Sequence, residues 1–590
     1  MGSFFTNKNH RIAISVLIFI SAIPYINTLS NDFVFDDISH IVENRELRDP
    51  SNLFSFIQRP RGIKYIILLT EYQIWGLNPF GYHLTNLILH ALCTISLYFL
   101  LTKIFINSRI PLITALLFAT HPIHTEAVTA ISNRTELLAM FFFTWSFSFY
   151  ILRKSSQWLY FFSIISFVLA LFSKEAAVVS LPVILILYDL YFTPLKEVSS
   201  PGKGKRFSKQ HGSRQNLKPF PKLWNFLKKN SWYYIPYGLI ILIFLLYLRF
   251  ILLIYPSSPE PKVAGLFLQQ SFPTYFYTAC KALLTYIQLL FFPINLNVAH
   301  MVPLSHSLFE WKVLVSLTSL FIFFILTIRM YTLSKAVSFG MAWFFITLFP
   351  LSNLLFPLTH YFVAERFLYL PSAGFCLVIA AVIDKLMGIG EKAFFIKQSP
   401  EKMAILLLIV IMGLYSGLTI NRNLDWRSNY TLWSKTVKQS PNSFRAHVNL
   451  AYDYAEKGLL DQAIIEYKEA LKNNPDNPSV YYNLGLAYHN MGLWDLAISS
   501  YEGALKIDPH DLDILNNLGI VYIKKGLFDN AIEVYKEALK IDPKNYMLYY
   551  NLSIAYKEKG LHNEAVLEFQ KALRINPDLK NADGLHVRPK

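Results

Sequence analysis

Twelve long apolar runs are the feature that most limits what this chain can fold into. Each approaches or exceeds the length that a helix needs to cross the ~30 Å hydrocarbon core of a bilayer. Only 16% of the residues are charged, against about 25% in ordinary soluble domains. A soluble core has no place for so many apolar segments, so the sequence predicts a multi-pass membrane protein. The runs lie at residues 12–29, 82–102, 110–130, 135–152, 157–173, 175–193, 232–254, 271–293, 311–329, 336–356, 367–387 and 403–421.

A second pattern begins near residue 442, where the charge density rises to that of a soluble domain. Proline recurs there every 34 residues, and leucine, tyrosine, glycine and alanine recur in the same phase. This period and these residue types are typical of the tetratricopeptide repeat (TPR), a helical hairpin that stacks into a solenoid. The sequence therefore predicts an all-α chain with a membrane module at 1–425, TPRs at 442–475, 476–509, 510–543 and 544–577, and a tail at 578–590. The recurring residues are Pro441, Pro475, Pro509, Pro543 and Pro577; Leu450, Leu484, Leu518 and Leu552; Tyr454, Tyr488, Tyr522 and Tyr556; Gly458, Gly492, Gly526 and Gly560; and Ala463, Ala497, Ala531 and Ala565.

The positions of lysine and arginine predict the orientation of the membrane module, because these residues concentrate in cytoplasmic loops. The loop at 194–230 is strongly basic and contains one acid, Glu197, so we predict that it is cytoplasmic. Alternation from this loop places the first loop, 31–65, and the TPRs outside. It also requires an odd number of crossings. We therefore predict eleven spans, with the segment 271–293 re-entrant or lying on the surface. The same distribution explains the net charge of +16 without a nucleic-acid partner.

The first external loop carries a pair of acids, Asp36 and Asp37, shortly after the first apolar run. A carboxylate beside apolar surface and a second carboxylate has a raised pKa, which suits a general base that takes a proton from a hydroxyl. The alternative is a solvated acidic turn with no role in chemistry.

Further charged and imidazole side chains lie at helix ends on the same predicted face. Such groups are costly in a membrane unless they are used or paired. Lys174 and Arg366, followed by Arg134, are the best candidates to bind a lipid phosphate; the alternative for each is a snorkelling anchor. His121, His124 and Glu126 could instead bind a divalent metal, although no fourth ligand is visible. The complete group is His121, His124, Glu126, Arg134, Glu136, Lys174, Glu175, Glu365 and Arg366.

One asparagine recurs on the first helix of each predicted TPR. These side chains could form a ladder that binds the backbone amides of an extended peptide without regard to its sequence. The alternative is that they form hydrogen bonds between neighbouring repeats. The four residues are Asn449, Asn483, Asn517 and Asn551.

Several sequence blocks occur in a fixed order ahead of the TPRs. They are Phe33–Asp37, Gly81–His90, His121–Val128 with Asn133–Glu136, Ser173–Glu175 and Ala364–Pro371. Together with the TPRs, this ordered set resembles the transmembrane-and-TPR family of protein O-mannosyltransferases and its bacterial relatives. The resemblance implies a GT-C fold and a polyprenyl- or dolichyl-phosphate sugar donor that is used on the non-cytoplasmic face. It also implies that Asp36 or Asp37 activates an acceptor hydroxyl, that the sugar is inverted, and that Lys174 and Arg366 stabilise the leaving phosphate.

Two classes of function follow from these patterns. The first is a membrane glycosyltransferase that moves a sugar, mannose by this resemblance, to a serine or threonine of a protein acceptor bound by the TPRs. The second is a non-enzymatic, membrane-anchored TPR scaffold, but eleven helices exceed what an anchor needs. For the glycosyltransferase, the sequence identifies no cofactor beyond the divalent metal that His121, His124 and Glu126 could bind. The predicted location is a bacterial inner membrane, or the endoplasmic reticulum in a eukaryote, with the TPRs on the non-cytoplasmic side.

Overall fold

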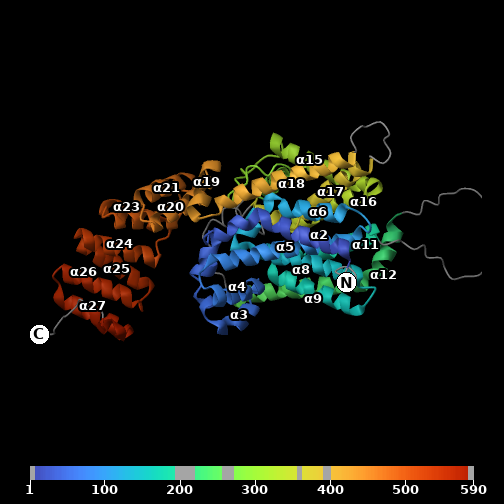
Figure 1. Ribbon diagram of the computed structural model, residues 1–590. Helices are drawn as coiled ribbons and strands as arrows, with labels where there is room; N and C mark the ends of the chain where they lie inside the picture. Colours follow the sequence, from blue (N-terminus) through green and yellow to red (C-terminus); the bar gives the residue numbers. More distant parts are fainter. Residues whose placement is uncertain (1–6, 193–218, 255–270, 355–361, 390–399, 582–590) are drawn as a thin grey trace, which may run out of the picture. The chain divides into compact units, whose positions relative to one another are not determined.

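The structure is a computed structural model that describes residues 7–192, 219–254, 271–354, 362–389 and 400–581 (Figure 1). It divides into two compact units, residues 1–428 and 429–590. All regular secondary structure among the described residues is helical, which confirms the all-α prediction. Most of the basic loop predicted at 194–230 and most of the tail predicted at 578–590 lie outside the described residues.

Each of the twelve apolar runs contains a helix. Six helical segments in the described part of the chain are long and apolar enough to cross a membrane: Lys8–Ser30, Pro79–Ile104, Ile131–Leu152, Asn230–Ile251, Trp311–Leu333 and Glu401–Asp425. The count of eleven spans stays a prediction. The helices are α2 (Lys8–Ala22), which continues as η1 (Ile23–Ser30), α5 (Pro79–Ile104), α6 (Ile110–Thr120), α8 (Arg134–Leu152), α9 (Gln157–Ser173), α11 (Leu181–Phe192), α12 (Pro219–Ile254), α14 (Phe272–Phe291), α15 (Trp311–Leu333), α16 (Lys335–Leu348), α17 (Ser372–Ile389) and α18 (Pro400–Asp425).

The burial of these helices separates a central group from a lipid-facing group. In α5 and in α8, more than 60% of the most apolar stretch of the helix is buried, whereas the buried share is 11% in α12 and α15 and 17% in α18. α5 packs on α8 and α8 on α9 (Figure 1). Because lipid is as apolar as leucine, close packing rather than the hydrophobic effect holds such helices together. Gly340 and Gly374 show this where α16 meets α17, since a Cβ on Gly340 would lie 2.7 Å from the Gly374 carbonyl oxygen.

The first loop is folded into short helices. The sequence shows no sign of this, because the loop has no clear helical or strand period. After η1 the chain forms η2 (Ile38–Val42), η3 (Arg45–Arg48), η4 (Pro50–Asn52), α3 (Leu53–Ile57) and α4 (Gly62–Trp75). Buried apolar side chains, including Ile41, Leu47, Phe56 and Leu68, pack these short elements together and against Tyr82 of α5. The loop is therefore a rigid cap on one end of the helices, and it positions the candidate site.

The second unit consists of α19 (Asn429–Gln439) followed by four helical hairpins. The recurring glycines adopt a left-handed conformation, with φ of +73° to +87°, at the turn inside each hairpin. Residues with a Cβ rarely adopt that conformation, which explains why glycine recurs. The recurring alanines are at most 3% exposed. Both facts confirm the TPR prediction. The hairpins are α20 (Phe444–Glu456) with α21 (Leu460–Asn473), α22 (Pro478–Asn490) with α23 (Trp494–Ile507), α24 (Leu512–Lys525) with α25 (Phe528–Ile541), and α26 (Tyr546–Glu558) with α27 (His562–Ile575), followed by η9 (Pro577–Asn581).

Candidate functional site

The two acids of the first loop have different environments. Asp37 is 1% exposed. Its Oδ1 accepts a hydrogen bond from the Ser132 amide at 2.6 Å, and its Oδ2 accepts from the amides of Ile131 and Val34 at 3.3 Å each. Asp36 is only partly buried, and its carboxylate makes no hydrogen bond or ion pair with the described residues. Asp37 thus fixes the loop, whereas the Asp36 carboxylate is available.

Burial governs the ionisation of Asp37. Removing this carboxylate from water raises its pKa from 3.8 to about 6, although three backbone amides oppose the shift. The preceding residue, Phe35, has a φ of +60°. A phenylalanine in the left-handed region is strained, and such strain persists where the surrounding contacts over-determine the backbone. The turn is therefore held rigidly in a shape that presents Asp36.

Helix α4 adds two cations that the sequence reasoning missed, Arg61 and Lys64. Arg61 caps α4 with a φ of +60° and binds Glu175 through two contacts, Nη2 to Oε1 at 2.7 Å and Nε to Oε2 at 3.3 Å. Lys64 is 4% exposed, and its ammonium lies 4.8 Å from the centre of the Tyr65 ring. Burial and nearby Arg61 lower the pKa of Lys64 to about 7. Both residues lie in a predicted external loop, where the positive-inside rule disfavours cations. That conflict with the rule could have identified them as candidate functional residues.

Lys174 and Arg366 lie beside the same aromatic ring. The Lys174 ammonium is 4.9 Å and the Arg366 guanidinium 5.3 Å from the centre of the Phe367 ring. Lys174, between α9 and α10 (Glu175–Val178), pairs with Glu136 of α8. Arg366, in η8 (Glu365–Leu368), pairs with Glu126, which also accepts the Arg366 backbone amide at 3.0 Å. The structure thus brings together two cations predicted from distant parts of the sequence, each held by a buried glutamate.

Arg134 has a different setting. Its side chain is fully buried and pairs with Glu71 of α4. Its Nε donates to Asn86 Oδ1 at 3.1 Å, and its Nη2 donates to the Tyr82 carbonyl oxygen at 3.2 Å. These contacts join α4, α5 and α8, and they occupy the guanidinium.

The two histidines of the HxxH block are also buried and bonded. His121 Nε2 donates to the Leu290 carbonyl oxygen at 3.1 Å, and its Nδ1 accepts from the Ile123 amide at 3.2 Å. His124 Nε2 lies 2.8 Å from Ser372 Oγ. Within the described residues, no group of three or more histidine, cysteine, aspartate or glutamate side chains is placed to hold a metal ion.

Glu365 belongs to a separate buried cluster. Its Oε1 accepts from His300 Nε2 at 2.8 Å and from the Asn297 amide, and Oε2 lies 3.5 Å from Arg422 Nη2. Arg422 in turn pairs with Asp425 at 2.9 Å. The cluster links η8 to the end of α18, so it supports the segment that carries Arg366.

The four TPR asparagines do not share one arrangement. Asn551 Nδ2 donates to Asn516 Oδ1 at 2.7 Å, and Asn517 Nδ2 donates to the Tyr482 hydroxyl at 3.0 Å, so both bond between repeats. Asn449 donates to the Arg445 carbonyl oxygen of its own helix at 2.8 Å. The Asn483 side chain makes no hydrogen bond with the described residues.

The fold and site define a class, a multi-pass membrane protein with ion pairs gathered at one end of its helices and a TPR solenoid. The family model for dolichyl-phosphate-mannose-protein mannosyltransferases matches residues 58–199. That range contains Arg61, Lys64, Arg134 and Lys174. TPR models match 451–492, 476–544 and 512–578.

Comparison with curated proteins shows which members of this class the chain is similar to. The chain is 26% identical to human protein O-mannosyl-transferase TMTC3 over 78% of its own length and 51% of that protein. It is 27% identical to human TMTC1 over 78% of this chain and 55% of that protein, and 26% identical to F38B6.6 of Caenorhabditis elegans over 77% and 62%. The chain is therefore a homologue of the TMTC-family protein O-mannosyl-transferases, and it spans about half the length of the first of these relatives. Among solved structures, MamA is 30% identical and matches 27% of this chain and 86% of its own, with a TM-score of 0.24.

Proposed function

We propose that this protein is an inverting glycosyltransferase that moves mannose from a polyprenyl- or dolichyl-phosphate donor to a serine or threonine hydroxyl of a protein acceptor. The proposal rests mainly on one observation. Three cations, Lys174, Arg366 and Arg61 at the start of α4, lie near one another in a chain that resembles mannosyltransferases. Arg61 pairs at 2.7 Å with Glu175, the residue next to Lys174. Lys174 and Arg366 both lie over the Phe367 ring. Asp36 lies in the same folded cap.

In this mechanism Asp36 is the general base, and Asp37 is a positioning residue that fixes the turn. Asp36 takes the proton of the acceptor hydroxyl while the hydroxyl oxygen attacks the anomeric carbon. The bond between that carbon and the phosphate oxygen breaks, and its electron pair leaves with the lipid phosphate. One displacement inverts the sugar, and no covalent enzyme intermediate is required.

The cations stabilise the negative charge that develops on the leaving phosphate. Arg61, Lys174 and Arg366 each pair with a glutamate, so the three pairs are neutral together and hold the side chains in place. Lys64 supplies the extra positive charge. An approaching phosphate favours its protonated form, which raises its pKa again. We leave Arg134 out of the donor site because its guanidinium is already occupied by Glu71, Asn86 and Tyr82.

The proposed acceptor partner is an extended peptide segment held by the TPR groove, with Asn483 as its best polar contact. This role, and a place for the repeats on the non-cytoplasmic side, rest on the loop charges and on the known use of TPR surfaces to bind peptides.

Glycan analysis of exported proteins tests the proposal in cells. Mass spectrometry is expected to find hexose on serine or threonine in cells with the wild-type gene, and to lose it in a deletion strain and in one carrying Asp36→Asn. Asp49→Asn, which changes an acid of the same loop whose carboxylate accepts from the Ser51 amide and hydroxyl, is the matched control and is expected to retain the glycans. Unchanged glycans in the deletion strain would favour the scaffold function.

A further inference from the structure

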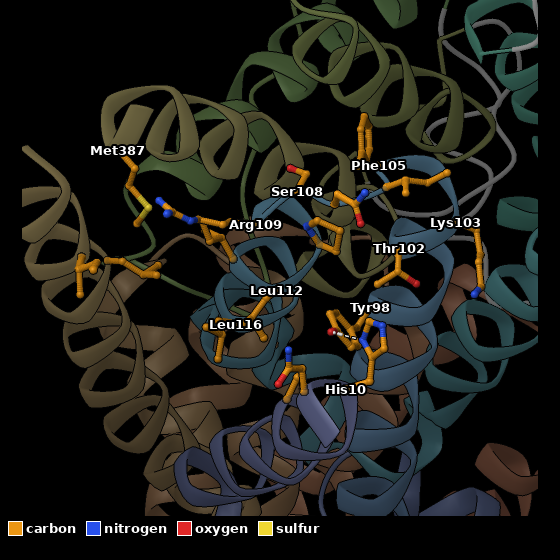
Figure 2. A pocket seen from close by; sticks show the side chains of 18 of the residues that line it. His10, Tyr98, Thr102, Lys103, Phe105, Ser108, Arg109, Leu112, Leu116 and Met387 are labelled. Carbon is orange, nitrogen blue, oxygen red and sulfur yellow. Dashed lines mark hydrogen bonds between the residues drawn. The ribbon is translucent and has the colours of Figure 1, made fainter. Parts of the chain in front are cut away.

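A cavity of about 830 Å³ opens at the other end of the membrane unit from the candidate site. The N-terminal end of α2, the C-terminal ends of α5, α8 and α17, and the N-terminal parts of α6 and α18 form its walls (Figure 2). The start of α5 bonds Arg134 through Asn86, whereas Thr102, near its other end, lines the cavity. Sixteen residues of helix separate these two side chains by about 24 Å, so the cavity is distinct from the site.

The cavity is amphipathic. Its apolar lining includes Leu112 and Leu116 of α6 and Ile405 and Leu408 of α18. Helix α18 packs on η1 and on α6, while its start borders the cavity. Beside the cavity, α2 and α18 expose apolar side chains, among them Ile12 at 54%, Ile405 at 43% and Ile409 at 59%. In a bilayer these surfaces face acyl chains, so the apolar wall continues from the cavity into the lipid.

The polar rim is mainly cationic. Lys103 and Arg109 line the cavity together with His10, whose Nδ1 lies 2.8 Å from the Tyr98 hydroxyl. Glu401 is the acid among the lining residues, and it lies 3.0 Å from Arg109. Those two side chains are 48% and 55% exposed, and exposed pairs of this kind are weak. The Arg109 guanidinium can therefore bind a stronger anion. Figure 2 shows His10, Thr102, Lys103 and Arg109 around the opening.

We propose that this cavity binds an anionic glycerophospholipid, with its phosphate at the cationic rim that Lys103 and Arg109 belong to and an acyl chain along Leu112, Leu116 and Leu408. Basic pockets between membrane helices on the cytoplasmic side recognise acidic lipid head groups. The positive-inside rule predicts that this end, where Lys8, Arg11, Arg153 and Lys154 also gather, is cytoplasmic. The cations can bind a phosphate, and the apolar wall can hold an acyl chain. A phospholipid would use both parts of the cavity, whereas a free phosphate would use only the cations. The proposal does not depend on the glycosyltransferase function.

Lipid binding to the purified full-length protein tests this proposal. The protein in neutral detergent is titrated with dioleoyl phosphatidylglycerol, with dioleoyl phosphatidylcholine, and with inorganic phosphate, and lipid adducts are counted by native mass spectrometry. We expect phosphatidylglycerol to bind in preference to phosphatidylcholine. Removing both cations with Lys103→Ala/Arg109→Ala is expected to weaken its binding about thirtyfold.

The matched control is Lys154→Ala/Arg329→Ala, which removes the same charge from exposed residues outside the cavity and is expected to bind as the wild type does. Leu112→Trp keeps the cations but fills the cavity, and it is expected to lose the lipid while eluting as a monodisperse protein. Equal lipid binding by the cavity variants and the control would overturn the proposal. Displacement of the lipid by millimolar inorganic phosphate would overturn it too, because it would show an anion site without a chain site.

Discussion

Two ion pairs in the membrane unit are close chemical matches but have different proposed roles. Arg134 and Glu71 have side chains 0% and 6% exposed, and Lys174 and Glu136 have side chains 8% and 3% exposed. Removing one partner of such a pair leaves a buried charge without compensation. We expect Arg134→Met and Lys174→Met each to destabilise the protein by about 3–5 kcal/mol.

Removing both partners should restore most of that loss, because no isolated charge remains. For Arg134→Met/Glu71→Met we expect a residual cost of about 1–2 kcal/mol, since Asn86 and the Tyr82 carbonyl lose their shared donor. Lys174→Met/Glu136→Met is expected to be about as stable as the wild type. Free energies of unfolding by SDS titration, followed by tryptophan fluorescence, measure all four changes in the full-length protein.

The two double variants should differ in donor binding. Loss of Lys174 removes a charge-assisted contact to the donor phosphate, so affinity for a polyprenyl-phosphate sugar should fall about 10- to 100-fold. Arg134→Met/Glu71→Met should bind the donor within about threefold of the wild type. A folded Arg134→Met/Glu71→Met protein that loses the donor as severely as the Lys174 variant would refute this division of roles.

Four further outcomes follow from the structure. Because the folded-state pKa of Asp37 is about 6 and its ordinary value 3.8, the stability that its protonation adds is present below pH 4 and lost as the pH rises through 6. Thermal scans from pH 4 to 7 should show up to about 3 kcal/mol of this dependence in the wild type and none in Asp37→Asn. Donor affinity should fall up to about tenfold per pH unit above the Lys64 pKa of about 7, and a similar fall in Lys64→Met would contradict that role. Asn551→Ala should destabilise the repeats by about 1–3 kcal/mol, because it leaves the Asn516 side chain without its hydrogen-bond donor. Asn483→Ala should instead weaken peptide binding. Unchanged peptide affinity in Asn483→Ala would count against peptide binding in the TPR groove.

The helices and repeats could be predicted because each follows a period that a single sequence displays. Apolar runs mark twelve helices of the membrane unit, although not those of the first loop, and the 34-residue interval places every TPR hairpin between its prolines. The positions of Gly458 and its equivalents follow from the same interval, because the chain must enter the left-handed region at each turn.

The pairing of charges could not be predicted in the same way. Lys174 and Glu136 are 38 residues apart, and Arg366 and Glu126 are 240 apart, so only the packing of the helices brings them together. The folded cap was missed because all its elements except α4 are at most five residues long, too short to show a period. The different environments of Asp36 and Asp37 also follow from packing, since the amide of Ser132, 95 residues away, holds only the second acid.

Transfer by the purified protein tests the central claim most directly. The full-length chain in nanodiscs is incubated with mannosyl-phosphoryl-polyprenol and a serine- and threonine-containing peptide, and the product is analysed by mass spectrometry and by NMR at the anomeric carbon. The account predicts a mannosylated hydroxyl of inverted configuration, with the rate reduced about 10²- to 10⁴-fold in Asp36→Asn. Transfer at an undiminished rate by Asp36→Asn, or a product that retains the donor configuration, would contradict it.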